Sequence, residues 1–179
     1  MIKKIMLIAI IGSLIGGVVF SGCLQTGTGQ LILKITDDPD LNITKANVTF
    51  SQVQVHLGVF GNESENETNG TSGWYTVVNV TQTFDLISLQ NVTALWGSAN
   101  LSAGWYTQIR LVVDSVVLTI DGIEYNCTIP SHVIKLIKPW RLVANETTTL
   151  ILDFDVQKSV HETGTGEFVF KPTIQVSQE

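Results

Sequence analysis

The sequence predicts an all-β protein, a single antiparallel β-sandwich with transthyretin-like or immunoglobulin-like topology. Charged residues make up only 15% of the chain while β-branched residues abound, and no window has the period of an amphipathic helix. About eight or nine short apolar segments are separated by turn signals, as in a sandwich. Asp121-Gly122, a dipeptide favoured in two-residue type I′ turns, joins two alternating segments. These three observations together favour the sandwich.

The hairpin around Asp121-Gly122 organises the middle of the chain, from residue 101 to residue 130. If Ile120 pairs with Ile123, the two strands present one continuous apolar face. That face contains Val116, Leu118, Ile120, Ile123, Tyr125, Cys127 and Ile129.

The apolar alternation slips by one residue at two places, and each slip predicts a β-bulge. The alternation of residues 109–113 is out of phase with that of residues 116–120, which places one bulge at Asp114-Ser115. The second slip places a bulge at Ser51-Gln52.

The remaining strands are expected at residues 31–35, 47–60, 74–80, 133–137, 140–143, 148–156 and 168–176, with a short strand or turn at 84–89. Residues 61–73 contain no apolar side chain and are expected to form a solvated loop. Pro172 lies inside the last segment. Since proline cannot donate to a ladder, that strand should be bulged or lie at an edge.

Residues 1–22 are expected to be a lipoprotein-type signal peptide. Their apolar segment, residues 5–20, has 16 residues and is shorter than the about 20 that cross a bilayer. Ser21-Gly22-Cys23 resembles a lipobox, so Cys23 is expected to carry a lipid; the alternative is an uncleaved single-span anchor. Residues 23–30 would be a polar tether and residues 31–179 the sandwich. The domain is thus expected outside the cytoplasm, anchored to the outer face of the cell membrane.

The charge argues against a nucleic-acid partner. The formal net charge is −6, and Lys3 and Lys4 would leave with the signal peptide. The sequence has no basic stripe and no aromatic run interleaved with Arg or Lys. The expected partners are the membrane, through the N-terminal lipid or anchor, and other envelope proteins or glycans.

Every asparagine in the chain begins an N-glycosylation sequon. The ten acceptors are Asn42, Asn47, Asn62, Asn66, Asn69, Asn79, Asn91, Asn100, Asn126 and Asn145. Ser and Thr make up 32 of 179 residues, so chance alone would place about 2 in ten asparagines in sequons. We therefore expect a glycoprotein. The alternative is a Thr-rich β composition whose sequons are not used.

Asp153 and Asp155 are the candidates for a polar site. Alternation places them on one face of the strand at 148–156, about 6.5 to 7 Å apart. Such a pair suits a glycosidase, or a Ca²⁺ site completed by Asp37, Asp38 or Asp40. Nothing else in the sequence supports either use, so a solvated strand face is the preferred interpretation and no cofactor is expected.

The histidines and cysteines do not suggest a reaction. His56, His132 and His161 share no zinc-ligand spacing, and no serine lies in a Gly-x-Ser-x-Gly motif. Cys127 would have no disulfide partner, because lipid would occupy Cys23, and its inward phase beside Tyr125 and Ile129 predicts an inert core thiol.

Four tryptophans offer a second possibility for binding. They are Trp74, Trp96, Trp105 and Trp140. Packing in the core or at a corner is the preferred interpretation, and stacking on sugars is the alternative.

Five segments resemble those of a known family. They are LKITDDPD (33–40), FDLISLQN (84–91), LSAGWYTQIRLVVD (101–114), LDFDVQKSV (152–160) and FKPTIQV (170–176). Their order and spacing resemble the domain of unknown function 4382, which occurs in secreted or lipid-anchored proteins of archaea and bacteria. The resemblance covers nearly all of the mature chain and implies a single β-sandwich with no assigned activity. Within it, Leu101-x-x-Gly104-x-Tyr106 is similar to the segment of transthyretin-like sandwiches in which a tyrosine pins a corner.

These observations predict a non-enzymatic, membrane-anchored, N-glycosylated cell-surface domain with a structural or interaction role. The combination of a lipobox with dense sequons indicates an archaeal envelope. The alternative is an extracytoplasmic protein that binds a cation or a glycan, through the Asp153/Asp155 face or exposed tryptophans.

Overall fold

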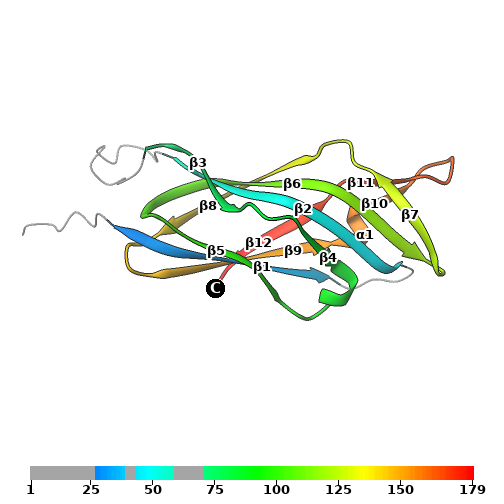
Figure 1. Cartoon of the computed structure of the whole chain (residues 1–179), viewed down its shortest axis with the longest axis horizontal. Coiled ribbons are helices and arrows are strands. Elements are labelled where there is room, and N and C mark those ends of the chain that lie inside the picture. Colours follow the sequence, from blue (N-terminus) through cyan, green and yellow to red (C-terminus); the bar gives the residue numbers. More distant parts are fainter. Residues whose placement is uncertain (1–26, 39–42, 59–70) are drawn as a thin grey trace, which may run out of the picture.

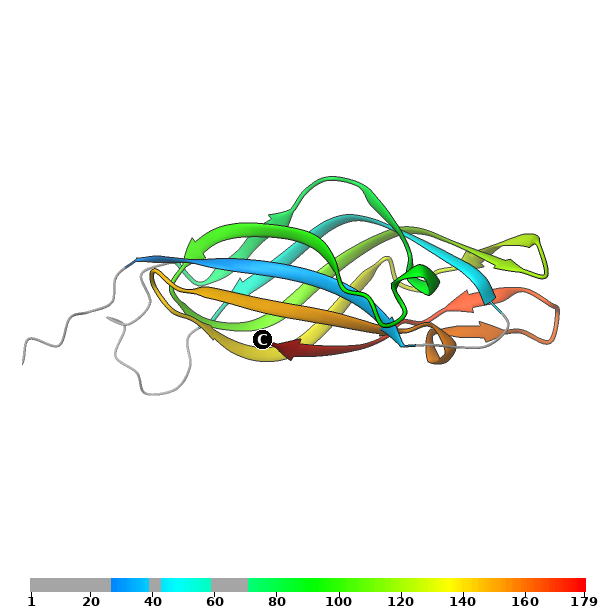
Figure 2. The ribbon, with the colours of Figure 1, turned by 90° about the horizontal axis from the view of Figure 1, so that it is seen from below.

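The computed structural model describes residues 27–38, 43–58 and 71–179. Within them, the chain forms two β-sheets that share one core (Figure 1, Figure 2). The helical segments in these residues are a 3₁₀ turn, η1 (Leu86–Leu89), and a one-turn helix, α1 (Val156–Ser159). The predicted all-β sandwich is confirmed.

The smaller sheet has four strands in the order β12, β9, β1, β5. These are β1 (Thr28–Asp38), β5 (Ala94–Ser102), β9 (Thr147–Asp155) and β12 (Thr173–Gln178). β1 pairs antiparallel with β5 on one side and parallel with β9 on the other. Its alternate side chains Leu31, Leu33 and Ile35 are fully buried, in the phase that the sequence predicts.

The larger sheet has the main order β10, β11, β7, β6, β2, β3, while β4 also pairs with β2 and β8 with β6. Its strands are β2 (Ile43–Leu57), β3 (Gly73–Val78), β4 (Gln82–Asp85), β6 (Gly104–Ile120), β7 (Ile123–Thr128), β8 (Val133–Leu142), β10 (Val160–Glu162) and β11 (Phe168–Phe170). The two sheets are mixed rather than purely antiparallel, because β9 runs parallel to β1 and β11 parallel to β7. Parallel pairs need long crossovers, so local turn signals do not reveal them.

The predicted register of the β6–β7 hairpin is confirmed, with Ile120 opposite Ile123. Asp121 and Gly122 have φ angles of 51° and 80°, as a type I′ turn requires. The apolar face becomes more exposed toward the turn: Leu118 is fully buried, whereas Ile123 is 57% exposed. The hairpin thus packs at its base and projects at its tip.

Both predicted bulges lie in the ladder between β2 and β6. In the pairing of these two strands, Asp114 on β6 and Ser51 on β2 have no residue opposite them. The hydroxyl of Ser51 donates to the Asp114 carboxylate at 2.8 Å, which joins the two extra residues. Because each bulge shifts the alternation by one residue, Phe50 and Val53 on either side can both be buried.

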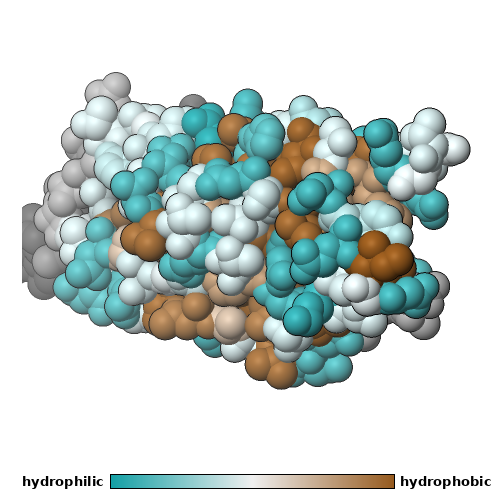
Figure 3. Space-filling view, turned by 45° about the vertical axis from the view of Figure 1, so that its right-hand side comes forward, coloured by the Kyte–Doolittle hydropathy of each residue, from teal (hydrophilic) through white to brown (hydrophobic). Residues whose placement is uncertain are grey.

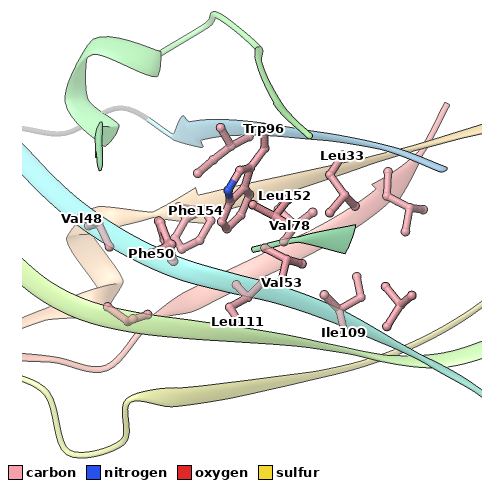
Figure 4. Packing of buried hydrophobic residues seen from close by; sticks show 14 of the residues in the cluster. Leu33, Val48, Phe50, Val53, Val78, Trp96, Ile109, Leu111, Leu152 and Phe154 are labelled. Carbon is pink, nitrogen blue, oxygen red and sulfur yellow. The ribbon is translucent and has the colours of Figure 1, made fainter. Parts of the chain in front are cut away.

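Aromatic rings from both sheets meet in the middle of the core (Figure 4). The ring centroid of Phe50, on β2, lies 4.6 Å from that of Trp96 on β5 and 5.7 Å from that of Phe154 on β9. None of the three side chains is more than 2% exposed. The two sheets therefore share one continuous core.

β5 is a strand that the sequence analysis did not predict. Leu95 on this strand is 67% exposed, and Gly97 interrupts its alternation. A Cβ on Gly97 would come within 2.6 Å of the Val78 side chain, so the glycine permits the close approach of β5 to β3. The residue that makes this contact possible also hides the strand pattern.

Two prolines have different effects on the predicted strands. β8 runs through Pro139 as one strand where two short ones were expected, and its ladder with β6 is irregular there, between Tyr106 and Gln108. Pro172 instead separates β11 from β12, which belong to different sheets. Segment 168–176 is thus two strands, and β12 is an edge strand as expected. Similarly, segment 84–89 contains the end of β4 followed by η1.

The start of β1 and the β6–β7 turn lie at opposite ends of the long axis (Figure 1, Figure 2). The Ala103 N–H donates to the carbonyl of Gly27 at 2.8 Å, so the described chain enters beside the start of β6. β6 has 17 residues and spans about 55 Å at about 3.3 Å per residue. The turn at Asp121 is therefore far from the point where the N-terminal segment joins the sandwich.

Candidate functional site

Several residues singled out in the sequence fall outside the described ranges. They are Cys23, Asp40, Asn42, Asn62, Asn66 and Asn69. The other six sequon asparagines are Asn47, Asn79, Asn91, Asn100, Asn126 and Asn145; Asn47 is partly exposed and the rest are exposed. Each of these six has its side chain at the surface, where a glycan would not displace core residues.

The Asp155 carboxylate caps a helix instead of sharing a solvated face with Asp153. It accepts a hydrogen bond from the Lys158 backbone N–H at 2.9 Å and forms an ion pair with the Lys158 ammonium. The side-chain hydrogen bond from Lys158 is the main cause that lowers the pKa of Asp155. Both aspartates lie in β9, but Asp155, its last residue, is only 9% exposed and its carboxylate is bonded to Lys158 of α1, so it does not belong to a solvated strand face.

The Asp37 carboxylate also accepts a hydrogen bond from the backbone. It is 3% exposed, and its Oδ1 accepts from the Val156 N–H at 3.2 Å, at the end of the parallel β1–β9 pair. Across the three described ranges, no group of three or more His, Cys, Asp or Glu residues is placed to hold a metal ion. The geometry in these ranges therefore favours structural roles for Asp37 and Asp155.

The tryptophans divide into two pairs. Trp96 and Trp140 are each 2% exposed, and Trp140 stacks on Tyr106 with centroids 5.1 Å apart. Trp74 and Trp105 are partly exposed. Packing is therefore the role of the first pair, and the alternative of ligand contact applies to the second pair alone.

Tyr106 forms the corner that its motif predicts. Its hydroxyl donates to the carbonyl of Ser102, four residues earlier, at 2.9 Å. Burial, with a smaller contribution from Tyr75, raises the pKa of Tyr106 well above its usual value. The hydroxyl therefore stays a proton donor over the whole physiological range.

Cys127 and the three histidines have different surroundings in the fold: Cys127 is a partly buried thiol, and the histidine rings differ in exposure and contacts. Cys127 is partly buried, and burial raises the pKa of its thiol to about 11. His132 Nδ1 lies 2.7 Å from the carbonyl oxygen of Val113, whereas His161 is exposed. His56 Nδ1 lies 3.1 Å from Thr107 Oγ1, on the outer surface of the larger sheet.

That outer surface carries a group of basic and amide side chains that the sequence analysis did not identify. They come from β2, β3, β6 and β8, which pair side by side. We call this group the basic face, and it consists of Gln54, His56, Trp74, Gln108, Arg110, Lys135, Ile137 and Arg141. All eight side chains are partly or fully exposed.

Arg110 lies at the centre of the basic face. Its Cζ is 3.9 Å from the centroid of the Trp74 ring, and the His56 ring meets the same ring with centroids 5.0 Å apart. In the sheet register Arg110 is opposite Gln54 on one side and Lys135 on the other. The cation–π contact therefore holds the guanidinium over the Trp74 ring, while Lys135 is opposite Arg110 on the neighbouring strand.

The cations of the basic face lie on chain segments that contain no acidic residue. Residues 51–58, 73–78, 104–113 and 133–142, which build the basic face, contain no Asp, Glu or Asn. The ion pairs between described residues are Lys34 with Glu179 and Lys158 with Asp155, so within that part of the chain Arg110, Lys135 and Arg141 have no carboxylate partner. This absence of carboxylates from four separate segments is the sequence signal that could have revealed the basic face.

Large apolar side chains are exposed at scattered positions. On the surface shown in Figure 3, apolar residues form several small groups between polar ones. The most exposed is Ile137 of the basic face, at 83%. In the described part of the chain, no helix has the length and apolar character needed to cross a bilayer.

Comparison with known families agrees with the motif-based resemblance. A family model described as "Domain of unknown function (DUF4382)" matches residues 28–172. The chain belongs to the DUF4382 family. No curated protein and no solved structure matches the chain. In this DUF4382 domain the match covers both sheets except the final strand, β12, so the family region and the sandwich nearly coincide.

Proposed function

We propose that this DUF4382 domain is a non-enzymatic, membrane-anchored, N-glycosylated cell-surface module with a structural or interaction role. The observation that carries the proposal is that all ten asparagines lie in sequons. The six that the structure describes support it, because none has a buried side chain. The lipobox-like Ser21-Gly22-Cys23 supports anchoring to the outer face of the cell membrane, and its combination with dense sequons supports an archaeal envelope.

A non-catalytic role fits the perturbed titratable groups. In the described residues, Asp155, Tyr106 and Cys127 have clearly shifted pKa values. Active sites collect such groups in one place, whereas here each has its own structural cause: a helix cap, a corner hydrogen bond and burial near the hairpin. The alternative of a cation site at Asp153 and Asp155 gains no support from this geometry.

Intact-mass analysis of the protein from its native host tests glycosylation. We expect a mass above that of the lipidated chain, and Thr128→Ala, which removes the sequon of Asn126, should lower it by one glycan. Ser98→Ala is the matched control, since Ser98 is exposed on a strand but belongs to no sequon. A mature chain that carries lipid and no sugar would contradict the glycoprotein proposal.

Membrane fractionation tests the anchor. Two acyl or ether chains on Cys23 would give stable attachment, so Cys23→Ala should release the protein or block cleavage of the signal peptide. Cys127→Ala should remain in the membrane fraction. If Cys23→Ala stays with the membrane at its mature mass, the lipid is not what anchors the protein.

A further inference from the structure

We propose that the basic face binds a linear acidic polysaccharide. The proposal goes beyond the surface role argued above and does not depend on whether the sequons are occupied. It rests on four observations: the charge of this surface, its hydrogen-bonding groups, its lack of acceptor asparagines and the nature of its edge.

The charge of the basic face is opposite to that of the chain as a whole. The formal net charge is −6, yet Arg110, Lys135 and Arg141 lie together on segments 104–113 and 133–142, which contain no carboxylate; Asp114, the next residue on β6, bonds to Ser51. Arg141 is opposite Trp105 in the register, five residues before Arg110, which places the backbone positions of the two arginines about 17 Å apart along β6. A linear polyanion lying along β6 could therefore contact successive cations with successive acidic groups.

The uncharged side chains of the basic face can form the contacts that sugars need. Gln54 and Gln108 carry amides that can both donate to and accept from hydroxyl groups, and Gln108 is opposite the highly exposed Ile137. Ile137 offers an apolar contact for the C–H groups of a sugar ring. The Arg110 guanidinium, whose Cζ lies 3.9 Å from the Trp74 ring centroid, has donors of the kind that bind a carboxylate through two hydrogen bonds.

The basic face is free of glycan acceptors. The four segments that build it contain no asparagine, whereas the other half of the same sheet carries Asn47 on β2 and Asn126 on β7. Even with every sequon occupied, no glycan would be attached to these four segments, although Asn79 follows β3 directly and accepts a hydrogen bond from Gln52 at 3.2 Å. The eight side chains of the basic face therefore carry no glycan of their own.

The edge of β8 argues against an added strand from a partner protein. Lys135, Lys138 and Pro139 lie on this strand, and lysine and proline are the residues that protect exposed edges from strand pairing. A ligand that lies across the side chains of the face, instead of along the backbone of the edge, is compatible with this protection. A polysaccharide binds in that way.

Affinity electrophoresis of the full chain, purified in detergent from native membranes, tests the proposal. Gels would contain polygalacturonate, the neutral polymer dextran or no polymer. We expect retardation by polygalacturonate alone. Because both protein and polymer carry net negative charge, retention requires a local basic surface.

Variants identify the surface. Arg110→Gln/Lys135→Gln should weaken the apparent affinity about tenfold or more, since two charge-assisted contacts are lost. Lys45→Gln/Lys171→Gln changes the net charge equally at exposed sites elsewhere and should bind as the wild type does. Lys135→Gln/Arg141→Gln replaces exposed side chains and leaves the Arg110–Trp74 contact in place, so it tests binding even if the Arg110 variant is destabilised.

Four results would overturn the proposal. They are absence of retardation, equal weakening by the Lys45/Lys171 control, binding of polyglutamate as tightly as polygalacturonate, and binding to phosphatidylglycerol vesicles without binding to the polysaccharide. The last two would assign the surface to an acidic polypeptide and to an anionic lipid surface. Glycan occupancy is measured separately by mass, so failure here leaves the glycoprotein proposal intact.

Discussion

Tyr106 fixes the corner between β5 and β6 through one hydrogen bond and one ring contact. The hydroxyl bonds to the Ser102 carbonyl, while the ring is fully buried and stacked on Trp140. Removing the hydroxyl alone leaves the ring contact in place. The two contributions can therefore be separated by a conservative substitution.

We expect Tyr106→Phe to lower the free energy of unfolding by about 1 to 2 kcal/mol, because the partly buried Ser102 carbonyl loses its donor. In a domain of this size, the melting temperature should fall by about 3 to 6 °C. Thermal unfolding followed by circular dichroism measures this. An unchanged melting temperature would mean that the corner is held by packing alone.

Asp155 contributes stability in a pH-dependent way. Its pKa is lowered in the folded state, chiefly by the hydrogen bond from Lys158, so its contribution is present above the unfolded pKa of about 3.9 and is lost as pH falls through the folded value. Asp155→Asn keeps a capping oxygen but removes the charge. Since Lys158 is well exposed, we expect Asp155→Asn to cost about 0.5 to 1 kcal/mol at pH 7.

The pH dependence is the test of that assignment. Urea titrations at pH 7 and pH 3 should show the difference between wild type and Asp155→Asn shrinking toward zero at the lower pH. A difference that is the same at both values would attribute the effect to packing. Asp155→Ala, which also removes the cap, should cost more at both values.

At the scale of elements, the β6–β7 turn depends on backbone conformation. Gly122 has φ of 80°, and a Cβ there would meet no atom within 4 Å, so any cost of substitution is conformational strain. We expect Gly122→Val to destabilise the fold by about 1 kcal/mol or more. Chemical denaturation gives the value.

Gly164, in the β10–β11 turn, is the matched control. Its surroundings are equally open, but its φ is not in the left-handed region. Gly164→Val should change the free energy of unfolding by about 0.5 kcal/mol or less. Equal effects of the two substitutions would refute the conformational explanation for Gly122.

Local signals explain which elements could be predicted from the sequence. The β6–β7 register follows from Asp121-Gly122, and the bulges at Ser51 and Asp114 follow from slips of alternation within one strand each. β5 could not be recognised, because Gly97 serves a contact with Val78 on a strand elsewhere in the chain. The parallel pairing of β1 with β9 has no local signature at all.

The basic face likewise could not be predicted from local sequence signals. Arg110, Lys135 and Arg141 are dispersed in the sequence and become neighbours only through the β6–β8 register. Asp153 and Asp155, by contrast, are close in the sequence and lie on one strand, but the one-turn helix α1 that follows takes up the Asp155 carboxylate, and alternation alone does not predict that contact. Sequence spacing thus located the elements more reliably than the surface they form.

For the whole molecule, the connectivity predicts slow folding. Contacts such as that between Asp37 and Val156 join residues 119 positions apart, and β1 cannot complete its sheet until β9 has been added. Non-local β topologies of this kind fold in milliseconds to seconds rather than microseconds. Stopped-flow refolding monitored by fluorescence of the buried Trp96 and Trp140 should show this, and microsecond refolding would contradict it.

The position of β1 also has a mechanical consequence. β1 lies between β5 and β9, and the N-terminal segment that joins it is the proposed attachment to the cell. A pull on that segment runs along the strand axis, so the ladders on both sides of β1 are loaded in shear and their hydrogen bonds resist together. Peeling an edge strand would break such bonds one after another. A domain attached through an inner strand can therefore bear tension between the cell and a bound partner. It should unfold at a higher force than if it were attached through the edge strand β12.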